Sequence, residues 1–289
     1  MNRTEVLRRR IDKHTPGLEI GPSHNPVASK REGYRVKVLD HLDQRGLNEK
    51  YKDDPGVDTS RIEEVDFVWR GEPFSELIDR GERFSWIIAS HVVEHVPDLI
   101  RFLNECDAVM EPGGVLTLAV PDKRFCFDRF RPLSSLGLVV DAHLSGSTRP
   151  SPGTVFDFYL NYARRNGRDG WNAGDPGMLQ FAFDFRKSME MMSLSRDGNY
   201  VDVHQWCFTP SSFRLLIDDL YRMGVTQLRE VEFLEQDGFE FFVWLSRAGS
   251  GSGLDRGELL RRIDKEAIDG VSRDPIRWGV RRLFRRVFS

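Results

Sequence analysis

The stretch GLEIGPSHNPV, Gly17–Val27, decides the fold. It begins with apolar residues around Glu19 and then passes into a Gly-Pro pair and a polar turn. This pattern predicts a β-strand that ends in a ligand-binding loop, since glycine lets a backbone come close to a ligand. A nicotinamide-binding loop needs three glycines, because its pyrophosphate approaches the backbone closely. Here Ser23, His24 and Pro26 stand in the loop, so the sequence disfavours pyrophosphate binding.

Further strand patterns follow, with helical patterns between them. The predicted strands are residues 17–21, 34–40, 65–69, 84–91 and 114–122. Between the last two, apolar residues recur at helical spacing until Pro112 ends the helix. Strands that alternate with helices predict an open parallel sheet covered on both faces.

The end of the core is predicted to be a helix followed by a hairpin. Residues 209–224 form the helix, with Thr209 as its N-cap. The apolar runs 226–235 and 239–246 are separated by Asp237-Gly238, a hairpin signal that makes the last strand antiparallel to its neighbour. The predicted fold class is therefore α/β, with a Rossmann-like, seven-stranded, mostly parallel sheet, an antiparallel C-terminal hairpin and a helical lid insertion.

The composition is that of an ordinary globular protein. Hydrophobic residues make up 39% and charged residues 30% of the chain, and the net charge of −3 offers no general attraction to nucleic acid. Cys106, Cys126 and Cys207 lack metal-site spacing, so we expect reduced core cysteines. The charged N-terminus is unlike a signal peptide, and no apolar run approaches the ~18 residues of a membrane span. We expect a cytoplasmic protein without a nucleic-acid partner.

Several stretches together resemble a known family. LEIGPSHNP, VLDHLD, VDFVW, ASHVVEHVPD and MEPGGVLTLAVPD occur in the order typical of class I S-adenosylmethionine-dependent methyltransferases, and the resemblance runs from Gly17 to Ala248. The loop departs from the family's full glycine-rich pattern. The version EIGPSHNP is similar to that of bacterial methyltransferases found with polysaccharide biosynthesis, including sugar O-methyltransferases. The resemblance implies an enzyme that transfers a methyl group from S-adenosyl-L-methionine to a hydroxyl of a saccharide or glycan precursor.

The resemblance also implies a set of cofactor-binding residues. Glu19 and Gly21 would face the methionine end of the cofactor, and Asp40 at the end of the second strand would accept hydrogen bonds from the ribose hydroxyls. The full set is Glu19, Gly21, His24, Asn25, Asp40, His41, Asp66, Phe67, Ser90 and His91. Within it, Asp66 and Phe67 would contact the adenine, and Ser90 and His91 the amino acid part of the cofactor. The alternatives are that Asp40 only caps its strand and that Asp66 is a turn residue.

The chain is predicted to divide into five segments. They are an N-terminal helix (1–16), the cofactor-binding Rossmann-like core (17–128), a lid and acceptor-binding insertion (129–203), the end of the core (204–248), and a linker with a basic amphipathic tail (249–289). The insertion is rich in aromatic residues and arginines, which suits a sugar that bears phosphate or a lipid carrier. The alternative is that the rings form the insertion's own small core.

A sugar hydroxyl is a poor nucleophile and benefits from a general base or a metal ion. We predict His143 as the base, with Asp141 orienting it, because imidazole titrates near neutral pH. His204 is a second candidate, or else a buried residue packed against Trp206. Asp122 and Asp141, with a histidine, are the candidates for binding a divalent cation such as Mg²⁺; Asp122 could instead be a turn cap.

The last segment and the overall activity leave alternatives open. A basic amphipathic helix over Asp274–Ser289 would contact an anionic membrane surface, the rest of the chain, or a second subunit of a homo-oligomer. The acceptor could be a non-sugar small molecule instead of a saccharide. A nucleotide-dependent oxidoreductase and a catalytically silent cofactor-binding scaffold are the remaining functional classes.

Overall fold

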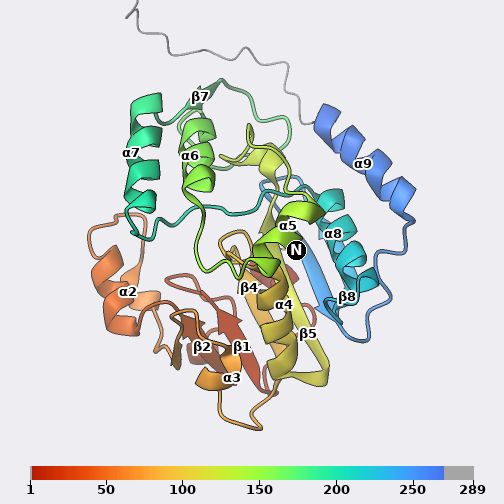
Figure 1. The fold of residues 1–289 in the computed structure, drawn as a ribbon. Helices are drawn as coiled ribbons and strands as arrows, with labels where there is room; N and C mark the ends of the chain where they lie inside the picture. The colour runs from red at the N-terminus through yellow and green to blue at the C-terminus, as the bar shows by residue number, and fades with distance from the viewer. Residues whose placement is uncertain (1, 270–289) are drawn as a thin grey trace, which may run out of the picture.

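The core is one twisted sheet with the strand order β3-β2-β1-β4-β5-β9-β8. The computed structural model describes residues 2–269 (Figure 1). The strands of the sheet are β1 (Gly17–Ile20), β2 (Val36–Asp40), β3 (Phe67–Val68), β4 (Phe84–Ser90), β5 (Met110–Pro121), β8 (Arg229–Glu235) and β9 (Glu240–Ser246). The first five are parallel, whereas β9 pairs antiparallel with both β5 and β8. The predicted fold class is confirmed.

Apolar residues bury both faces of this sheet. One face packs against α3 (Phe74–Leu77), α4 (Leu99–Val109), α5 (Leu136–Leu144) and α8 (Pro210–Arg222). The other face packs against α1 (Arg3–Leu7) and the loop around Val27. β1 is buried along its whole length, which agrees with its sequence being apolar except for Glu19.

The N-terminal helix is shorter than the predicted 1–16. It ends at Leu7, and the following Arg9 and Arg10 pair with Glu232 on β8. Pro16 also disfavours helical geometry at the residue before it. The N-terminus is therefore anchored across the sheet to the C-terminal hairpin.

The insertion between β5 and α8 forms a layer above the sheet (Figure 1). Besides α5, it contains α6 (Pro152–Asn161), α7 (Phe185–Arg196) and the small antiparallel pair β6 (Ala163–Arg165) and β7 (Leu179–Phe181). Its own core contains Val155, Phe158, Val201 and Val203. Phe127 stacks on Tyr162 with ring centroids 4.5 Å apart. Much of the aromatic content of this segment therefore stabilises the insertion itself.

The segment after β9 is not the separate appendage that the sequence suggested. Residues 256–269 form α9 (Arg256–Asp269), which packs on α8 (Figure 1). Glu266 is buried and accepts hydrogen bonds from the Ser211 backbone N–H at 3.1 Å and from the Ser211 hydroxyl at 2.6 Å. Because this contact is made by a charged residue, the hydrophobic pattern of the sequence does not predict it. The predicted amphipathic stretch Asp274–Ser289 lies outside the described residues, and no helix among 2–269 is long and apolar enough to cross a membrane.

The backbone of β1 at Gly17 lies close to the ring of Trp86 on β4. The Cβ of Gly17→Ala would lie 2.0 Å from the buried ring of Trp86, so the substitution should lower the free energy of unfolding. We expect a loss of ~1–3 kcal/mol, typical of overpacking. Gly113→Ala is the matched control, since no described heavy atom lies within 4 Å of its Cβ. Urea unfolding measures both variants, and equal stability losses would contradict the packing argument.

Candidate active site

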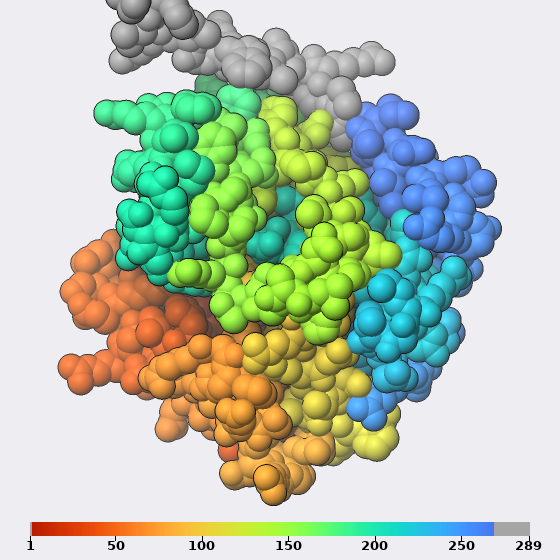
Figure 2. Space-filling model, in the orientation of Figure 1, coloured from red at the N-terminus to blue at the C-terminus, as the bar shows by residue number. Residues whose placement is uncertain are grey.

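A cavity of about 490 Å³ opens where β1, β2 and β4 end. Its walls come from the loops after β1, β2, β3 and β4, from the C-terminal end of α2 (Gln44–Tyr51), and from the insertion through Thr148, Tyr200 and Asp202. Figure 2 shows the surface hollowed between the green insertion and the orange segments below it. The volume suits a cofactor-sized molecule.

The loop after β1 is pinned to the end of β2 by Asp40. This carboxylate is buried and accepts a hydrogen bond from the Ser23 backbone N–H at 3.0 Å and from the His41 backbone N–H at 2.7 Å. The His41 ring lies 2.6 Å from the same carboxylate, and Lys50 lies 3.1 Å from the other ring nitrogen. Asp40, the residue predicted to bind the ribose, and His41, another predicted cofactor-binding residue, both line the cavity, and each carboxylate oxygen can accept more than one bond.

Glu19 does not face the cavity, which corrects its predicted position. Its side chain is buried and accepts hydrogen bonds from the backbone N–H groups of Val27 at 2.6 Å and Ala28 at 2.9 Å. Burial raises the pKa of this carboxyl to about 7, although both amide bonds favour the charged form. Glu19 therefore shapes the loop rather than contacting a ligand.

The remaining residues of this loop divide between cavity and surface. Gly21 lines the cavity with a φ of +64°, a left-handed conformation that glycine adopts without strain. Ser23 also lines it. The ring of His24 packs edge-on against Tyr51 at 5.2 Å, and Asn25 is exposed, so neither of these two predicted residues lines the cavity.

Asp66 and Phe67, the predicted adenine contacts, precede and begin β3. Asp66 accepts a hydrogen bond from the Val38 backbone N–H at 2.8 Å and pairs with Lys30 at 2.6 Å, while Phe67 is the first residue of β3. Because β3 has only two residues, the chain reaches the cavity at Trp69, Arg70 and Gly71. These three residues therefore stand where Asp66 and Phe67 were expected.

His91 enters the cavity after β4, whereas Ser90 does not. The hydroxyl of Ser90 accepts a hydrogen bond from Arg3 at 2.5 Å, on the side of α1. His91 has a φ of +54° and lies 2.8 Å from Glu240 and 3.4 Å from Glu94. Burial opposes protonation of this ring, but the two carboxylates outweigh it and raise the pKa of His91 to about 9. The side chain is therefore a fixed positive charge at neutral pH.

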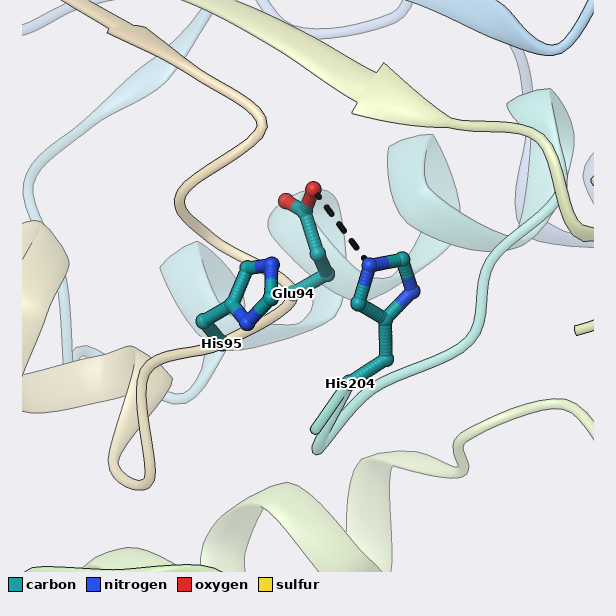
Figure 3. A group of neighbouring side chains, drawn as sticks. All are labelled: Glu94, His95 and His204. Carbon is teal, nitrogen blue, oxygen red and sulfur yellow. Dashed lines mark ion pairs between the residues drawn. The ribbon is translucent and has the colours of Figure 1, made fainter. Parts of the chain in front are cut away.

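Glu94 and His95, further along the same loop, form a cluster with His204; of the three, only His204 was predicted to take part in chemistry. His95 lines the cavity, and its Nδ1 lies 2.8 Å from Asp202. His204 is buried behind it, with its ring centroid 4.7 Å from that of His95. Glu94 is buried between them (Figure 3). The signal in the sequence for this cluster is the acid–histidine pair Glu94-His95 in the loop that follows β4.

The predicted base and its partner are placed elsewhere. His143 lies on α5 and pairs with Asp98, the N-cap of α4, at 2.9 Å. Asp141 is exposed on the same helix and cannot orient His143, since residues two apart on a helix do not face each other. Asp122 is buried in an ion pair with Arg124 at 2.6 Å, so Asp122 and Asp141 do not form a metal site. Of the predicted catalytic residues, only His204 adjoins the cavity-lining His95.

The strand order, the cavity at the ends of β1, β2 and β4, and the acid that ends β2 define the class as an S-adenosylmethionine-dependent methyltransferase of class I. Residues 3–168 match the family model described as a methyltransferase domain. This match covers more than half of the chain, so the chain belongs to that family.

Curated relatives are similar over short stretches. The ubiquinone biosynthesis O-methyltransferase of Chelativorans sp. (strain BNC1) is 34% identical over 76 residues, which is 26% of this chain and 27% of that protein. The enzyme of the same name from Rhodopseudomonas palustris (strain HaA2) is 40% identical over 50 residues, 17% of this chain and 20% of its own length. The matched region thus spans about a quarter or less of these relatives.

A solved structure with a similar fold is an S-adenosylmethionine-dependent methyltransferase from Methanosarcina mazei, with 15% identity, a TM-score of 0.41, and coverage of 85% of this chain and 98% of that one. Both curated relatives are named as ubiquinone biosynthesis O-methyltransferases, so the predicted similarity to sugar O-methyltransferases is not supported.

Membership of this family implies S-adenosyl-L-methionine as the cofactor, and the residues present fit it. A Cβ added at Gly21 would lie 3.1 Å from the side chain of Val92, so a larger residue at this position would crowd the wall of the cavity. Asp40 offers an acceptor for ribose hydroxyls, and His91 offers a positive charge for a carboxylate. A methyl donor bound here supplies an electrophilic methyl group, while the protein positions it and the acceptor.

We expect Asp40→Asn to weaken binding of S-adenosylhomocysteine by ~10- to 100-fold, the usual range for removing a charged hydrogen-bond partner. Asp66→Asn is the matched control, because that side chain is held by Lys30 and the Val38 amide outside the cavity. Isothermal titration calorimetry compares the two variants with the wild type. A larger loss in Asp66→Asn than in Asp40→Asn would overturn the assignment of the ribose site.

The raised pKa of Glu19 predicts a pH-dependent stability. Its pKa is about 7 in the folded chain against 4.5 for an unperturbed glutamate, so the folded state binds more protons between these values. The free energy of unfolding should therefore fall as pH rises from 4.5 to about 7, by up to about 3 kcal/mol. Glu19→Gln has no proton to lose and should lack this decline. Urea unfolding at several pH values tests it, and parallel pH profiles for the two proteins would refute it.

Proposed function

We propose that this chain methylates a hydroxyl group of a small-molecule acceptor, and that the hydroxyl is activated at His95. The observation that supports the proposal is the His95–Asp202 pair on the cavity wall, with 2.8 Å between ring nitrogen and carboxylate. Asp202 holds one ring nitrogen, so the other can act on an acceptor oxygen. The relatives named as O-methyltransferases agree with oxygen as the methylated atom.

The acceptor we propose carries its hydroxyl on a ring, and a saccharide is one candidate. Tyr51, Trp69 and Tyr200 bring aromatic faces to the cavity, and Lys50 and Asp202 add polar groups beside them. Aromatic faces with a few convergent polar groups suit a hydroxylated ring. Among these residues, Tyr200 and Asp202 come from the insertion that the sequence predicted for the acceptor, while many of its other rings pack within the insertion itself.

The sequence of events follows from where the groups lie. The acceptor would enter between α2 and the insertion and place its hydroxyl near His95. Methyl transfer from a sulfonium is an in-line displacement, so most of the catalysis comes from holding the oxygen opposite the departing sulfur. Removing the hydroxyl proton adds to this, because an alkoxide is a far better nucleophile than an alcohol.

We expect His95→Gln to reduce turnover by ~10²- to 10⁴-fold, the range typical of losing a group that handles the reacting proton. Its affinity for S-adenosylhomocysteine should stay close to the wild-type value. His143→Gln is the contrasting variant, because His143 pairs with Asp98 away from the cavity and its loss should leave turnover nearly unchanged.

The assay measures formation of S-adenosylhomocysteine with a panel of monosaccharides, sugar phosphates and phenols as acceptors. Turnover that falls with His143→Gln but not with His95→Gln would contradict the proposed site. Tight cofactor binding without turnover of any acceptor would favour a catalytically silent binding protein instead.

A further inference from the structure

We propose that Glu94, His95 and His204 bind a divalent transition-metal ion, with Zn²⁺ as the best match. One potential ligand atom from each residue lies within 4.8 Å of the other two. Figure 3 shows the three side chains converging from two segments, the loop after β4 and the strand-like stretch that leads into α8. Two histidines and one carboxylate are a common donor set of catalytic zinc sites, which keep a further position open.

The two imidazoles are held in the way that metal-ligating histidines are held. His95 directs Nδ1 to Asp202 at 2.8 Å, and His204 directs Nδ1 to Asp128 at 2.5 Å. When Nδ1 donates its proton to a carboxylate, Nε2 keeps a free lone pair. A carboxylate behind each ring fixes this tautomer and increases the basicity of the ligand nitrogen. Asp202 comes from the insertion and Asp128 from its flank.

Glu94 is a buried carboxylate that lacks adequate partners. Its side chain is 2% exposed, and neither oxygen has a hydrogen-bond partner among the described residues. Its ion-pair contacts are long, at 3.4 Å to His91 and 3.9 Å to Nε2 of His204. The protonated ring of His91 supplies one positive charge at 3.4 Å, but its Nε2 is engaged by Glu240 at 2.8 Å, and both oxygens of Glu94 still lack hydrogen bonds. A buried ionised carboxylate without hydrogen bonds is costly, and a metal ion between Glu94 and His204 would offset that cost.

The distance between Glu94 and His204 admits an ion between them. The 3.9 Å between Glu94 and His204 is too long for a hydrogen bond. It is slightly shorter than the sum of a zinc–nitrogen and a zinc–oxygen bond, about 4.2 Å. An ion can therefore touch both atoms at once. The nitrogen-rich donor set favours Zn²⁺ over Mg²⁺, which prefers six oxygen ligands.

The open position of this site would face the cavity, because His95 lines it while Glu94 and His204 lie behind. This part of the inference rests on the proposed function, with His95 acting on the acceptor hydroxyl through the ion instead of directly. A bound ion lowers the pKa of an acceptor hydroxyl, as it does for water. The hydroxyl proton passes to water, the oxygen forms the new bond to the methyl carbon, and the carbon–sulfur bond breaks with both electrons remaining on sulfur.

The test measures metal binding directly and needs no acceptor. The full chain, freed of any affinity tag and stripped with a chelator, is dialysed against Zn²⁺, Mn²⁺ or Mg²⁺ and its metal content is determined by mass spectrometry. We expect one Zn²⁺ per chain in the wild type. His95→Gln and Glu94→Gln should bind Zn²⁺ at least ~10-fold more weakly, as expected when a metal ligand is lost. His14→Gln, on the exposed loop before β1, is the control and should bind like the wild type.

Folding of each variant is checked by circular dichroism, because Glu94 is buried and its replacement could disturb the core. Replacement of Zn²⁺ by Co²⁺ in the wild type gives a second measurement that needs no variant, since a protein nitrogen site changes the visible spectrum of cobalt. Absence of stoichiometric Zn²⁺, or binding unchanged in a folded His95→Gln, would overturn the metal site. The proposed function would survive that outcome if turnover still depended on His95, which would then act as the base.

Discussion

Two buried carboxylates on neighbouring strands hold the loop on which the cavity depends. Asp40 at the end of β2 binds the amide of Ser23 near the start of the loop, and Glu19 inside β1 binds the amides of Val27 and Ala28 at its end. A loop without the family's full set of glycines is thereby fixed at both ends by charge-assisted or neutral hydrogen bonds to acids. The positions of Gly21 and Ser23 on the cavity wall follow from this double anchoring.

The core supplies the cofactor end of the site, and the insertion completes the other end. His95 belongs to the loop after β4, but Asp202, which orients it, comes from the end of the insertion. His204 and its partner Asp128 likewise lie at the two flanks of that segment. A substitution in the insertion would therefore act on groups of the core. In the proposed function, the acceptor would therefore meet residues from a part of the chain that the fold itself does not require.

The sequence predicted the features that depend on local patterns. Apolar runs predicted the strands, and Asp237-Gly238 predicted the hairpin. Asp40 could be identified because an acid that ends a parallel strand lies at the carboxyl ends of the strands, where the cavity opens. The sequence could not show that Glu19 binds amides, since the loop's return path was unknown. It also could not pair His95 with Asp202 across 107 residues. His143 failed as the predicted base for the same reason: its nearest carboxylate is Asp98, distant in sequence, rather than Asp141.

Ion pairs beside the cavity connect α1 and β9 to the site. His91 adopts a left-handed conformation that a histidine adopts only at a cost, and the contact with Glu240 on β9 helps to hold it there. Arg3 on α1 binds the same glutamate and also Ser90, so the first helix and the last strand together fix the loop after β4. The protonated ring then presents a constant positive charge at the wall where the family resemblance places the cofactor's carboxylate. Weakening the anchorage of α1 would therefore disturb the site by releasing His91, without touching a cavity-lining residue.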